Sequence, residues 1–234
     1  MGENYFLHER AFDECLDRLA PVARPFSSAL VYGPLLPGWA DRLRAIGIVE
    51  VNSIEQGEDV PPIASDLCLS IGALDTAEEL PGLLGALRHL LAPDALLIGA
   101  FAGGDSLKVL RSAMLAADQA DERPASAHVH PRIDPPSFAA LLANEGFVAP
   151  VVDVDRVTLR YSSFDGLVRD LRGMATTNRL TARARRPILR RGLAAARARF
   201  ADEATEGRTS ETVDLIHFAA WTPRDHPDWR LINN

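Results

Sequence analysis

Apolar and polar residues form blocks with two different periods along the first 120 positions. Residues 8–19 place apolar side chains three to four positions apart, which predicts an amphipathic helix. Consecutive apolar residues follow at 29–32 and 67–74, and such runs are typical of strands buried on both faces of a parallel sheet. Helical patterns separate these runs. We therefore expect alternating strands and helices, which give a parallel sheet with helices on both faces.

Short local sequences predict where several helices begin and end. Gly47 follows WADRLRAI and predicts the end of a short helix, after which 48–54 is expected to be a strand. Thr76 and Glu79 have the spacing of a capping box, so we expect a helix to begin there. Asp105 precedes another helical pattern, and we expect its carboxylate to cap that helix.

The second half of the chain has longer elements. Residues 148–161 alternate apolar and polar side chains and predict a long strand. A last strand is expected at 212–221. Between them, residues 163–204 have a helical pattern with one apolar stripe, formed by Phe164, Leu167, Val168, Leu171 and Met174. The chain thus predicts an α/β core whose last two strands are separated by a helical insertion.

These elements predict three parts. The α/β core comprises residues 1–161 and 208–224, a helical lid comprises residues 162–207, and a C-terminal tail comprises residues 225–234. The lid enters the core between the last two strands, so it should lie over the carboxyl end of the sheet. Open α/β sheets bind their ligands at that end. We therefore expect the lid to cover a ligand or to bind a partner.

Length and composition narrow the class of protein. A chain of 234 residues can form one substantial core with a subdomain. Its apolar stretches are shorter than the roughly 18 residues of a membrane span, and MGENYFLHERAFDE lacks the order of a secretory signal. Cys15 and Cys68 stand alone, without metal-site spacing, and we expect two buried thiols in a reducing compartment. These features predict a soluble cytoplasmic protein.

The net charge of −7 conceals a basic segment. Ten arginines but only two acidic residues, Asp165 and Asp170, lie between positions 162 and 200. Within the sequence RARRPILRRGLAAARARF, one side of a predicted helix presents Arg183, Arg186, Arg190 and Arg197. A solvated helix face is our first interpretation and an acidic protein partner the second. Nucleic acid ranks third, because aromatic side chains that could stack on bases are scarce nearby.

Two longer stretches resemble a known family. The run SDLCLSIGALDTAEELPGLLGALRHLLAPDALLIGAFAGGDSLKVLRSAML resembles the later half of class I S-adenosylmethionine (SAM) methyltransferases. The run DRVTLRYSSFDGLVRDLRGMATTNRL resembles one branch of that superfamily, the methyltransferase-like assembly factors of respiratory complex I, which are relatives of the biotin-pathway carboxyl methyltransferase. The resemblance covers about residues 8 to 224. It implies a Rossmann-like three-layer sandwich, here trimmed by about one strand-helix unit, with SAM as cofactor and a protein as partner.

In this family a glycine-rich turn after the first strand holds the cofactor, because glycines let the backbone approach it and the next helix offers free N–H groups. The corresponding turn here is VYGPLLPGW. Only Gly33 and Gly38 remain of the expected glycines. Two prolines remove backbone donors, while Leu35 and Leu36 add side chains where close approach is needed. We expect SAM binding to be lost or much weakened; the alternative is a divergent loop that binds SAM from another angle.

An acidic residue at the end of the family's second strand accepts the ribose hydroxyls. Only about 33 residues separate the first strand from Asp66, which leaves room for one helix and one strand instead of two of each. We therefore interpret 48–54 as the family's third strand and expect the ribose-binding carboxylate to be missing. Glu50 and Asn52 are poor substitutes for it.

The resemblance assigns candidate residues to two sites, although it identifies no catalytic residue. A bound SAM should contact Tyr32, Gly33, Gly38 and Asp66, with Asp75 near the mouth of the substrate site. The lid run supplies candidate substrate or partner residues: Arg160, Tyr161, Asp170, Arg172, Gly173, Met174 and Asn178. The alternative for each lid residue is a structural role, as a surface ion pair or in packing.

Two other polar sequences carry weaker hypotheses. His128 and His130, followed by Asp134, could share a metal, but no third strong ligand is fixed by spacing, so we expect no metal site. Gly103 and Gly104 precede a helix whose N-terminus could hold an anion. The alternative is that these glycines only form the turn.

Three functions remain open at this point. The first is a pseudoenzyme that acts through its lid as an assembly or scaffolding factor. The second is an active SAM-dependent enzyme that modifies a protein or a small acid. The third is a nucleic-acid-binding module that uses the arginines. The sequence contains no G-x-S-x-G elbow, phosphate-binding P-loop or paired zinc cysteines, which makes those enzyme classes poor candidates.

Overall fold

The computed structural model describes residues 5–55, 64–181, 183 and 186–225. These residues form two compact units, which are described separately. The sheet unit takes Leu7–Phe101, Ile133–Val154 and the chain from Ile216, whereas the helical unit takes Ala102–Arg132 and Asp155–Leu215. Residues 226–234, nearly all of the expected tail, lie outside the described part of the chain.

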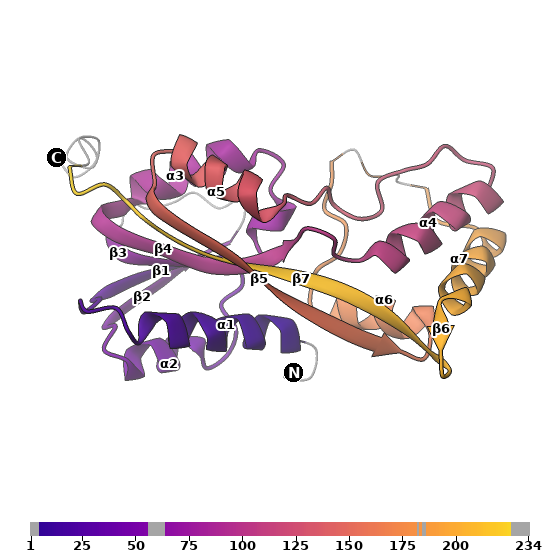
Figure 1. Cartoon of the computed structure of the whole chain (residues 1–234), viewed down its shortest axis with the longest axis horizontal. Helices are drawn as coiled ribbons and strands as arrows, with labels where there is room; N and C mark the ends of the chain where they lie inside the picture. Colours follow the sequence, from indigo (N-terminus) through magenta and orange to yellow (C-terminus); the bar gives the residue numbers. More distant parts are fainter. Residues whose placement is uncertain (1–4, 56–63, 182, 184–185, 226–234) are drawn as a thin grey trace. The chain divides into compact units, whose positions relative to one another are not determined.

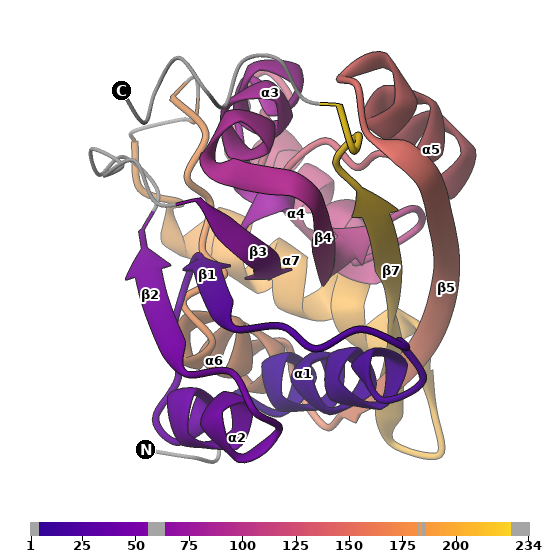
Figure 2. The same cartoon turned by 90° about the vertical axis from the view of Figure 1, so that its left-hand side faces the viewer.

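Seven strands form the sheet: β1 (Ser28–Tyr32), β2 (Glu50–Ile54), β3 (Ser65–Ile71), β4 (Leu91–Gly103), β5 (Val148–Tyr161), β6 (Ala204–Thr205) and β7 (Arg208–Trp221). Their order is β2-β1-β3-β4-β7-β5, and β6 pairs with β7 in antiparallel orientation (Figure 2). β4, β5 and β7 each contribute residues to both units. The strands expected from apolar runs and from alternation are all present.

The position of β2 corrects one interpretation. β1 pairs in parallel with β2 on one side and with β3 on the other, and β3 pairs in parallel with β4. In the Rossmann order 3-2-1-4-5-6, the second strand lies directly beside the first. The strand predicted at 48–54 therefore takes the place of the second strand, not the third. Among the described residues, no strand takes the outermost place beside β2.

Helices cover both faces of the sheet unit, which confirms the predicted three-layer α/β architecture. α1 (Phe6–Leu19) and α2 (Trp39–Ala45) lie on one face, and α3 (Leu80–Leu90) and α5 (Pro135–Asn144) lie on the other (Figure 1). α2 ends just before Gly47, which has a positive φ of 101°, as its sequence predicts.

Aromatic contacts fill both layers between helices and sheet. The Phe138 ring of α5 packs edge-on against Phe101 and Phe218, with ring centroids 4.8 and 5.1 Å away. On the other face, Phe12 of α1 stacks on Trp39 of α2 at 4.3 Å between centroids. These pairs bury large apolar surfaces, which are the main stabilising contribution in such a core.

The helical unit contains α4 (Lys108–Ala120), α6 (Phe164–Gly173) and α7 (Arg190–Asp202), and α7 packs along α4 (Figure 1). The buried carboxylate of Asp121 accepts the N–H of Leu189 at 2.8 Å and that of Gly192 at 3.0 Å. It therefore caps α7 from the end of α4, which it follows directly. A Cβ on Gly192 would lie 2.7 Å from the Asp121 carboxyl carbon, so this position needs glycine.

The expectation of one helical stretch from 163 to 204 is wrong. α6 ends at Gly173, and Ala175 has a positive φ of 57° that a helix does not allow. α7 begins only at Arg190, after Pro187, because proline disfavours helix for the residue before it and lacks an N–H. The described residues between these helices, Arg183 among them, are not helical.

Both expected helix caps are also wrong. Thr76 lies in a 3-10 turn, Leu74–Thr76, where its hydroxyl donates to Ala73 O, and α3 begins at Leu80 without a side-chain cap. At α4, the capping carboxylate is that of buried Glu211, which accepts the N–H groups of residues 109 and 110 at 3.3 and 2.7 Å. Asp105 instead forms an ion pair with Lys108.

The N-terminus of α4, which the sequence offered as a possible anion site, is occupied by the carboxylate of Glu211. Burial raises the pKa of Glu211, although three backbone N–H groups donate to it. Asp214 supports the turn before α4, since it accepts the N–H of Asp105 at 3.1 Å and pairs with Arg156 at 2.7 Å.

Both cysteines lie in the sheet unit. Cys15 and Cys68 are both buried and free, as predicted, and burial raises the pKa of each thiol to about 12. Among the described helices, none combines the length and the apolar character that crossing a bilayer requires.

The contact between α4 and α7 gives a stability prediction. Gly192→Ala should lower the free energy of unfolding by roughly 1 to 3 kcal/mol, because the new methyl group overlaps the Asp121 carboxyl. Gly82→Ala in α3 is the matched control, since a Cβ there has open space, and it should be neutral or stabilising by up to about 1 kcal/mol. Urea denaturation measures both. Equal losses in the two variants would contradict this account.

Candidate functional site

The turn after β1 brings the backbone close to the segment that follows β3. Gly33 has a φ of 108°, and its N–H donates to Ile54 O at the end of β2 over 2.9 Å. A Cβ on Gly33 would lie 2.7 Å from the Cβ of Ala73. Glycine is therefore required at this position by the fold itself, and its presence is no separate sign of a cofactor.

The remainder of the 33–38 turn is apolar. The Leu36 side chain is buried and Leu35 is half-buried. Gly38 has a φ of 86° and occupies the N-cap position of α2, without a side-chain cap. α2 has only seven residues, and the N–H of Trp39 already donates to Leu36 O. The helix start therefore offers few free donors to an anionic or polar ligand.

An acidic residue follows β2 at the position that accepts ribose hydroxyls in dinucleotide folds. Glu55 comes directly after Ile54, the last residue of β2, and Ile54 is the residue that bonds to Gly33. The sequence analysis missed Glu55 because it placed the strand third in the sheet and searched inside it, at Glu50 and Asn52. The sequence did contain a signal for Glu55, because it is the first carboxylate after Ile54, the apolar residue that ends the strand.

Asp66 does not belong with Tyr32 and Gly33. Its carboxylate accepts hydrogen bonds from the backbone N–H groups of Ser27 and Ser28, at 2.9 and 3.0 Å. It therefore joins the amino ends of β1 and β3, whereas Tyr32 and Gly33 lie at the carboxyl end of β1. Its expected contact with the same cofactor has no support in this geometry.

A histidine from α1 lies at the carboxyl end of β3. His8 is buried, and a Cβ on Gly72 would lie 2.5 Å from its Nε2 atom. Burial lowers the pKa of His8, although the nearby charge of Asp75 acts in the opposite direction. The structure thus places Asp75, expected at a substrate mouth, near an imidazole that the sequence analysis did not single out.

The lid candidates do not form one cluster. Burial, followed by the negative charge of Asp170, raises the pKa of Tyr161. Met174 is buried, which supports its packing role. Arg160 reaches the β6–β7 hairpin, where it pairs with Glu206 at 3.4 Å. Gly173 is the last residue of α6.

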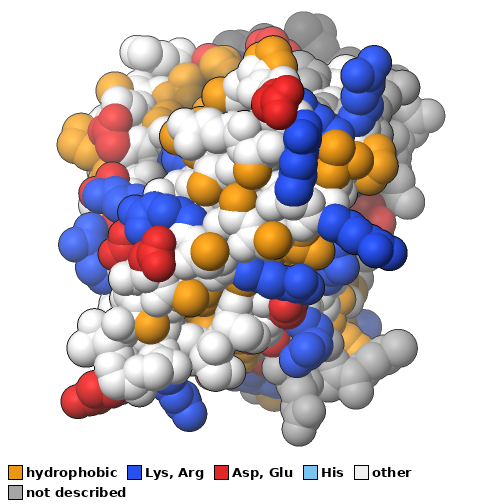
Figure 3. Space-filling view, turned by 90° about the vertical axis from the view of Figure 1, so that its right-hand side faces the viewer, with side chains coloured by type: hydrophobic (Ala, Val, Ile, Leu, Met, Phe, Trp, Pro, Cys, Tyr) orange, Lys and Arg blue, Asp and Glu red, His pale blue; other side chains and the backbone are white. Residues whose placement is uncertain are grey.

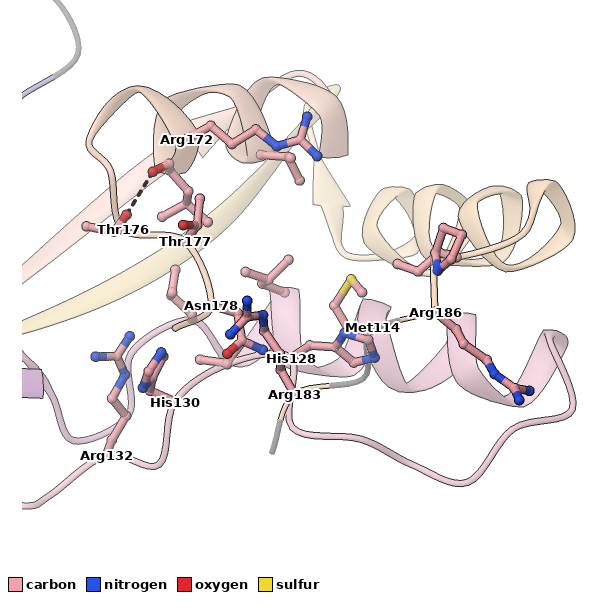
Figure 4. Close-up of a pocket in the computed structure, with 17 residues that line it drawn as sticks. Met114, His128, His130, Arg132, Arg172, Thr176, Thr177, Asn178, Arg183 and Arg186 are labelled. Atoms are coloured by element: carbon pink, nitrogen blue, oxygen red, sulfur yellow. Dashed lines mark hydrogen bonds between the residues drawn. The ribbon is translucent and has the colours of Figure 1, made fainter. Parts of the chain in front are cut away.

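The other two lid candidates line a pocket of about 400 Å³ in the helical unit, together with α4 and the loop that follows it (Figure 4). The pocket wall includes these polar side chains: Arg172, Thr176, Thr177, Asn178, Arg183, Arg186, His128, His130 and Arg132. Asn178 ties the two segments together, because its Nδ2 donates to Ala127 O at 2.7 Å.

Both loop histidines are held by hydrogen bonds. His130 Nε2 accepts the N–H of Arg179 at 2.9 Å. His128 Nε2 lies 3.0 Å from the carboxylate of buried Asp118. Burial opposes ionisation of Asp118, but hydrogen bonds from His128 and from Ser126 hold its pKa below the usual range. These imidazole atoms serve the fold and are not free to bind a metal.

The third expected member of that group is elsewhere. Asp134 caps α5 in the sheet unit, where it accepts the N–H of Ser137 at 2.9 Å. Within the described residues, no group of three or more His, Cys, Asp or Glu side chains is placed to hold a metal ion.

The arginines of α7 are largely paired with acids. Arg197 forms two bonds to Asp165, at 2.9 and 3.0 Å, and Arg191 bonds to Glu122 at 3.2 Å. One face of the helical unit shows Lys and Arg side chains spread across it, some beside acidic side chains and others not (Figure 3). Of the four arginines expected on one helix face, Arg183 and Arg186 precede α7 and are not on it. All four are exposed, and within the described part of the chain only Arg197 among them pairs with an acid, so the first interpretation, a solvated surface, still stands for the others.

Comparison with known proteins identifies the family. The mitochondrial arginine-hydroxylase NDUFAF5 of Danio rerio is 31% identical over an alignment of 246 residues. The alignment covers 94% of this chain and 76% of that protein. The chain belongs to the methyltransferase-like assembly factors of respiratory complex I. This NDUFAF5-like chain is also 30% identical to the malonyl-[acyl-carrier protein] O-methyltransferase of Laribacter hongkongensis over 173 residues, or 73% of this chain and 56% of that protein. No family model matches the chain.

Solved structures confirm the fold of this NDUFAF5-like chain. A putative methyltransferase from Bacillus halodurans superposes with a TM-score of 0.56 at 10% identity, over 91% of this chain and 98% of that one. The YcgJ protein of Bacillus subtilis gives a TM-score of 0.52 at 10% identity, over 92% and 99%. At this identity the likeness shows the class I methyltransferase fold alone.

The buried imidazole of His8 gives a pH prediction. Its folded-state pKa lies below the unfolded value near 6.5, so the unfolded chain takes up this proton first as the pH falls. Between pH 7 and pH 5, the free energy of unfolding of the wild-type chain should therefore fall more steeply than that of His8→Gln. Urea denaturation at several pH values measures the two slopes. Identical slopes would show that His8 titrates as it does in the unfolded chain.

Proposed function

We propose that this chain is a methyltransferase-like assembly factor whose cofactor turn no longer binds SAM with useful affinity. It acts instead by binding a protein partner through the lid segment 162–207. The observation that carries this proposal is the 33–38 turn, where buried Leu36 and the close approach of Gly33 to Ala73 occupy positions that the family keeps as bare backbone.

Two further features support a filled cofactor position. The N–H of Trp39, the first donor of α2, is used within the turn, which leaves fewer free N–H groups at the start of this helix. At the end of β3, His8 packs against the backbone of Gly72, where a ligand above the carboxyl edge of the sheet would need space. Binding SAM would require both the turn and His8 to move.

The proposal that a protein partner binds to the lid rests on the family and on the lid sequence. The relatives named NDUFAF5 are assembly factors, which act on other proteins. The run DLRGMATTN, which resembles that branch, lies in the lid of this chain. It spans the C-terminal half of α6 and the non-helical segment after it, so it presents both a helix end and exposed backbone to a partner.

One observation favours a second candidate, an active SAM-dependent enzyme that modifies a protein. Glu55 stands directly after β2 and beside Gly33, where a carboxylate would accept ribose hydroxyls. In that case Tyr32, Gly33 and Glu55 hold the nucleoside. The curated relatives are named as an arginine hydroxylase and as a methyltransferase, so the reaction type would itself need to be determined.

A calorimetric titration with SAM and with its demethylated product separates the two candidates. The proposal expects no saturable heat up to roughly millimolar ligand, which corresponds to a binding free energy weaker than about −4 kcal/mol. A malonyl-[acyl-carrier protein] O-methyltransferase serves as the positive control. Micromolar binding would overturn the proposal. In that event Glu55→Gln should weaken binding and Glu50→Gln, at the far end of β2, should not.

A complementation assay tests the partner half. Deleting the gene in its native host should lower the amount of assembled complex I on native gels, and the Glu55→Gln chain should restore it as well as wild type does. Arg179→Glu, which reverses an exposed charge of the lid segment, should restore it poorly, since losing one charged contact at a protein interface costs roughly tenfold in affinity. Normal assembly in the deletion strain would contradict the assembly role.

A further inference from the structure

The pocket of the helical unit joins an apolar floor to a positive rim. Its floor is made by Leu107, Leu110 and Met114 from the start of α4 and by Val168 and Leu171 from α6. A volume of about 400 Å³ lies within the range of roughly 300 to 1,000 Å³ that small-molecule sites occupy. The pocket is therefore large enough for a small ligand with an apolar body.

The charge around this floor has one sign. Arginine side chains line the pocket from three segments, and none of the described residues that line it is an aspartate or a glutamate. Figure 4 shows Arg172 coming from α6, Arg132 from the loop after α4, and Arg183 from the segment after α6. The Arg186 side chain extends away from the other labelled residues.

The arginines of the pocket differ from those on α7 in their partners. Arg191 and Arg197 are neutralised by Glu122 and Asp165. Arg172, in contrast, forms no ion pair or side-chain hydrogen bond with any described residue, and Arg183 donates only to the carbonyl of Leu180, at 3.0 Å. Within the described part of the chain, two exposed guanidinium groups therefore lie beside an apolar hollow without a carboxylate as a partner, which favours an anion there.

We propose that this pocket binds a small amphipathic anion, an aliphatic chain that ends in one carboxylate. The aliphatic chain lies on the floor of α4 and α6, and the carboxylate pairs with Arg172 on the α6 side of the rim, while Arg183 adds positive charge on the other side. A guanidinium fork suits a carboxylate because it donates two parallel hydrogen bonds. The same charge repels a cationic ligand. This site is independent of the 33–38 turn and goes beyond the function proposed above.

The probes are decanoate, hexanoate, acetate and decyltrimethylammonium, titrated calorimetrically into the full chain below their micelle concentrations. Decanoate should bind saturably with one molecule per chain, and affinity should fall about fourfold for each methylene removed. Acetate and decyltrimethylammonium should show no saturable binding, since one lacks the apolar body and the other carries the wrong charge. Equal affinity for decanoate and the cationic probe would overturn the proposal.

Two matched variants locate the anion. Arg172→Gln should weaken decanoate binding by roughly tenfold or more, because it removes a hydrogen bond between charged groups. Arg169→Gln makes the same change on the same helix, but Arg169 does not line the pocket, so affinity should stay at the wild-type level. Equal effects of the two variants would overturn the assignment.

Sedimentation with vesicles of phosphatidylglycerol and of phosphatidylcholine tests for a membrane surface. The proposal expects no sedimentation of the chain with either. Binding to the anionic vesicles that Arg172→Gln abolishes would reassign these arginines to lipid headgroups. None of these measurements involves SAM or complex I, so their failure leaves the proposed function intact.

Discussion

The carboxyl edge of the sheet depends on two places where backbone must approach another group without a Cβ between them. Gly33 lies against Ala73, and Gly72 lies against His8. In a methyltransferase fold this edge is where a ligand enters, so the space that glycine creates is ordinarily available to a cofactor. Here the atoms that face these two glycines are those of Ala73 and His8. Packing alone therefore accounts for glycine at both positions, and neither glycine is a separate sign of a cofactor.

Carboxylates play a comparable part in the helical unit. Glu211 holds the start of α4, and Asp121 holds the start of α7. Both acids come from a different element than the helix they cap, so each one fastens two elements together as well as satisfying backbone donors. The N-termini of these two helices, which could bind an external anion, are thus occupied by carboxylates of the chain itself. Among the described residues, Arg172 and Arg183 of the nearby pocket have no carboxylate as a partner, which is why we infer a ligand there.

The sequence predicted well what is decided locally. The strands, the end of α2 near Gly47 and the burial of both cysteines follow from short-range pattern, and the fold class follows from their order. The helix caps failed because Glu211 lies about a hundred residues from the helix it caps, so no local spacing could indicate it. The break between α6 and α7 was readable at Pro187 but was outweighed by the helical composition around it. Glu55 was missed because the strand before it was given the wrong place in the sheet.

In the described part of the chain, β2 is the last strand of the sheet on its side. An edge strand can recruit a strand from another molecule, and proteins commonly prevent this by keeping such strands short and polar. β2 has five residues, and Glu50, Asn52 and Ser53 make most of it hydrophilic. Those residues, which make little sense as cofactor contacts, are well suited to keeping the trimmed sheet from polymerising.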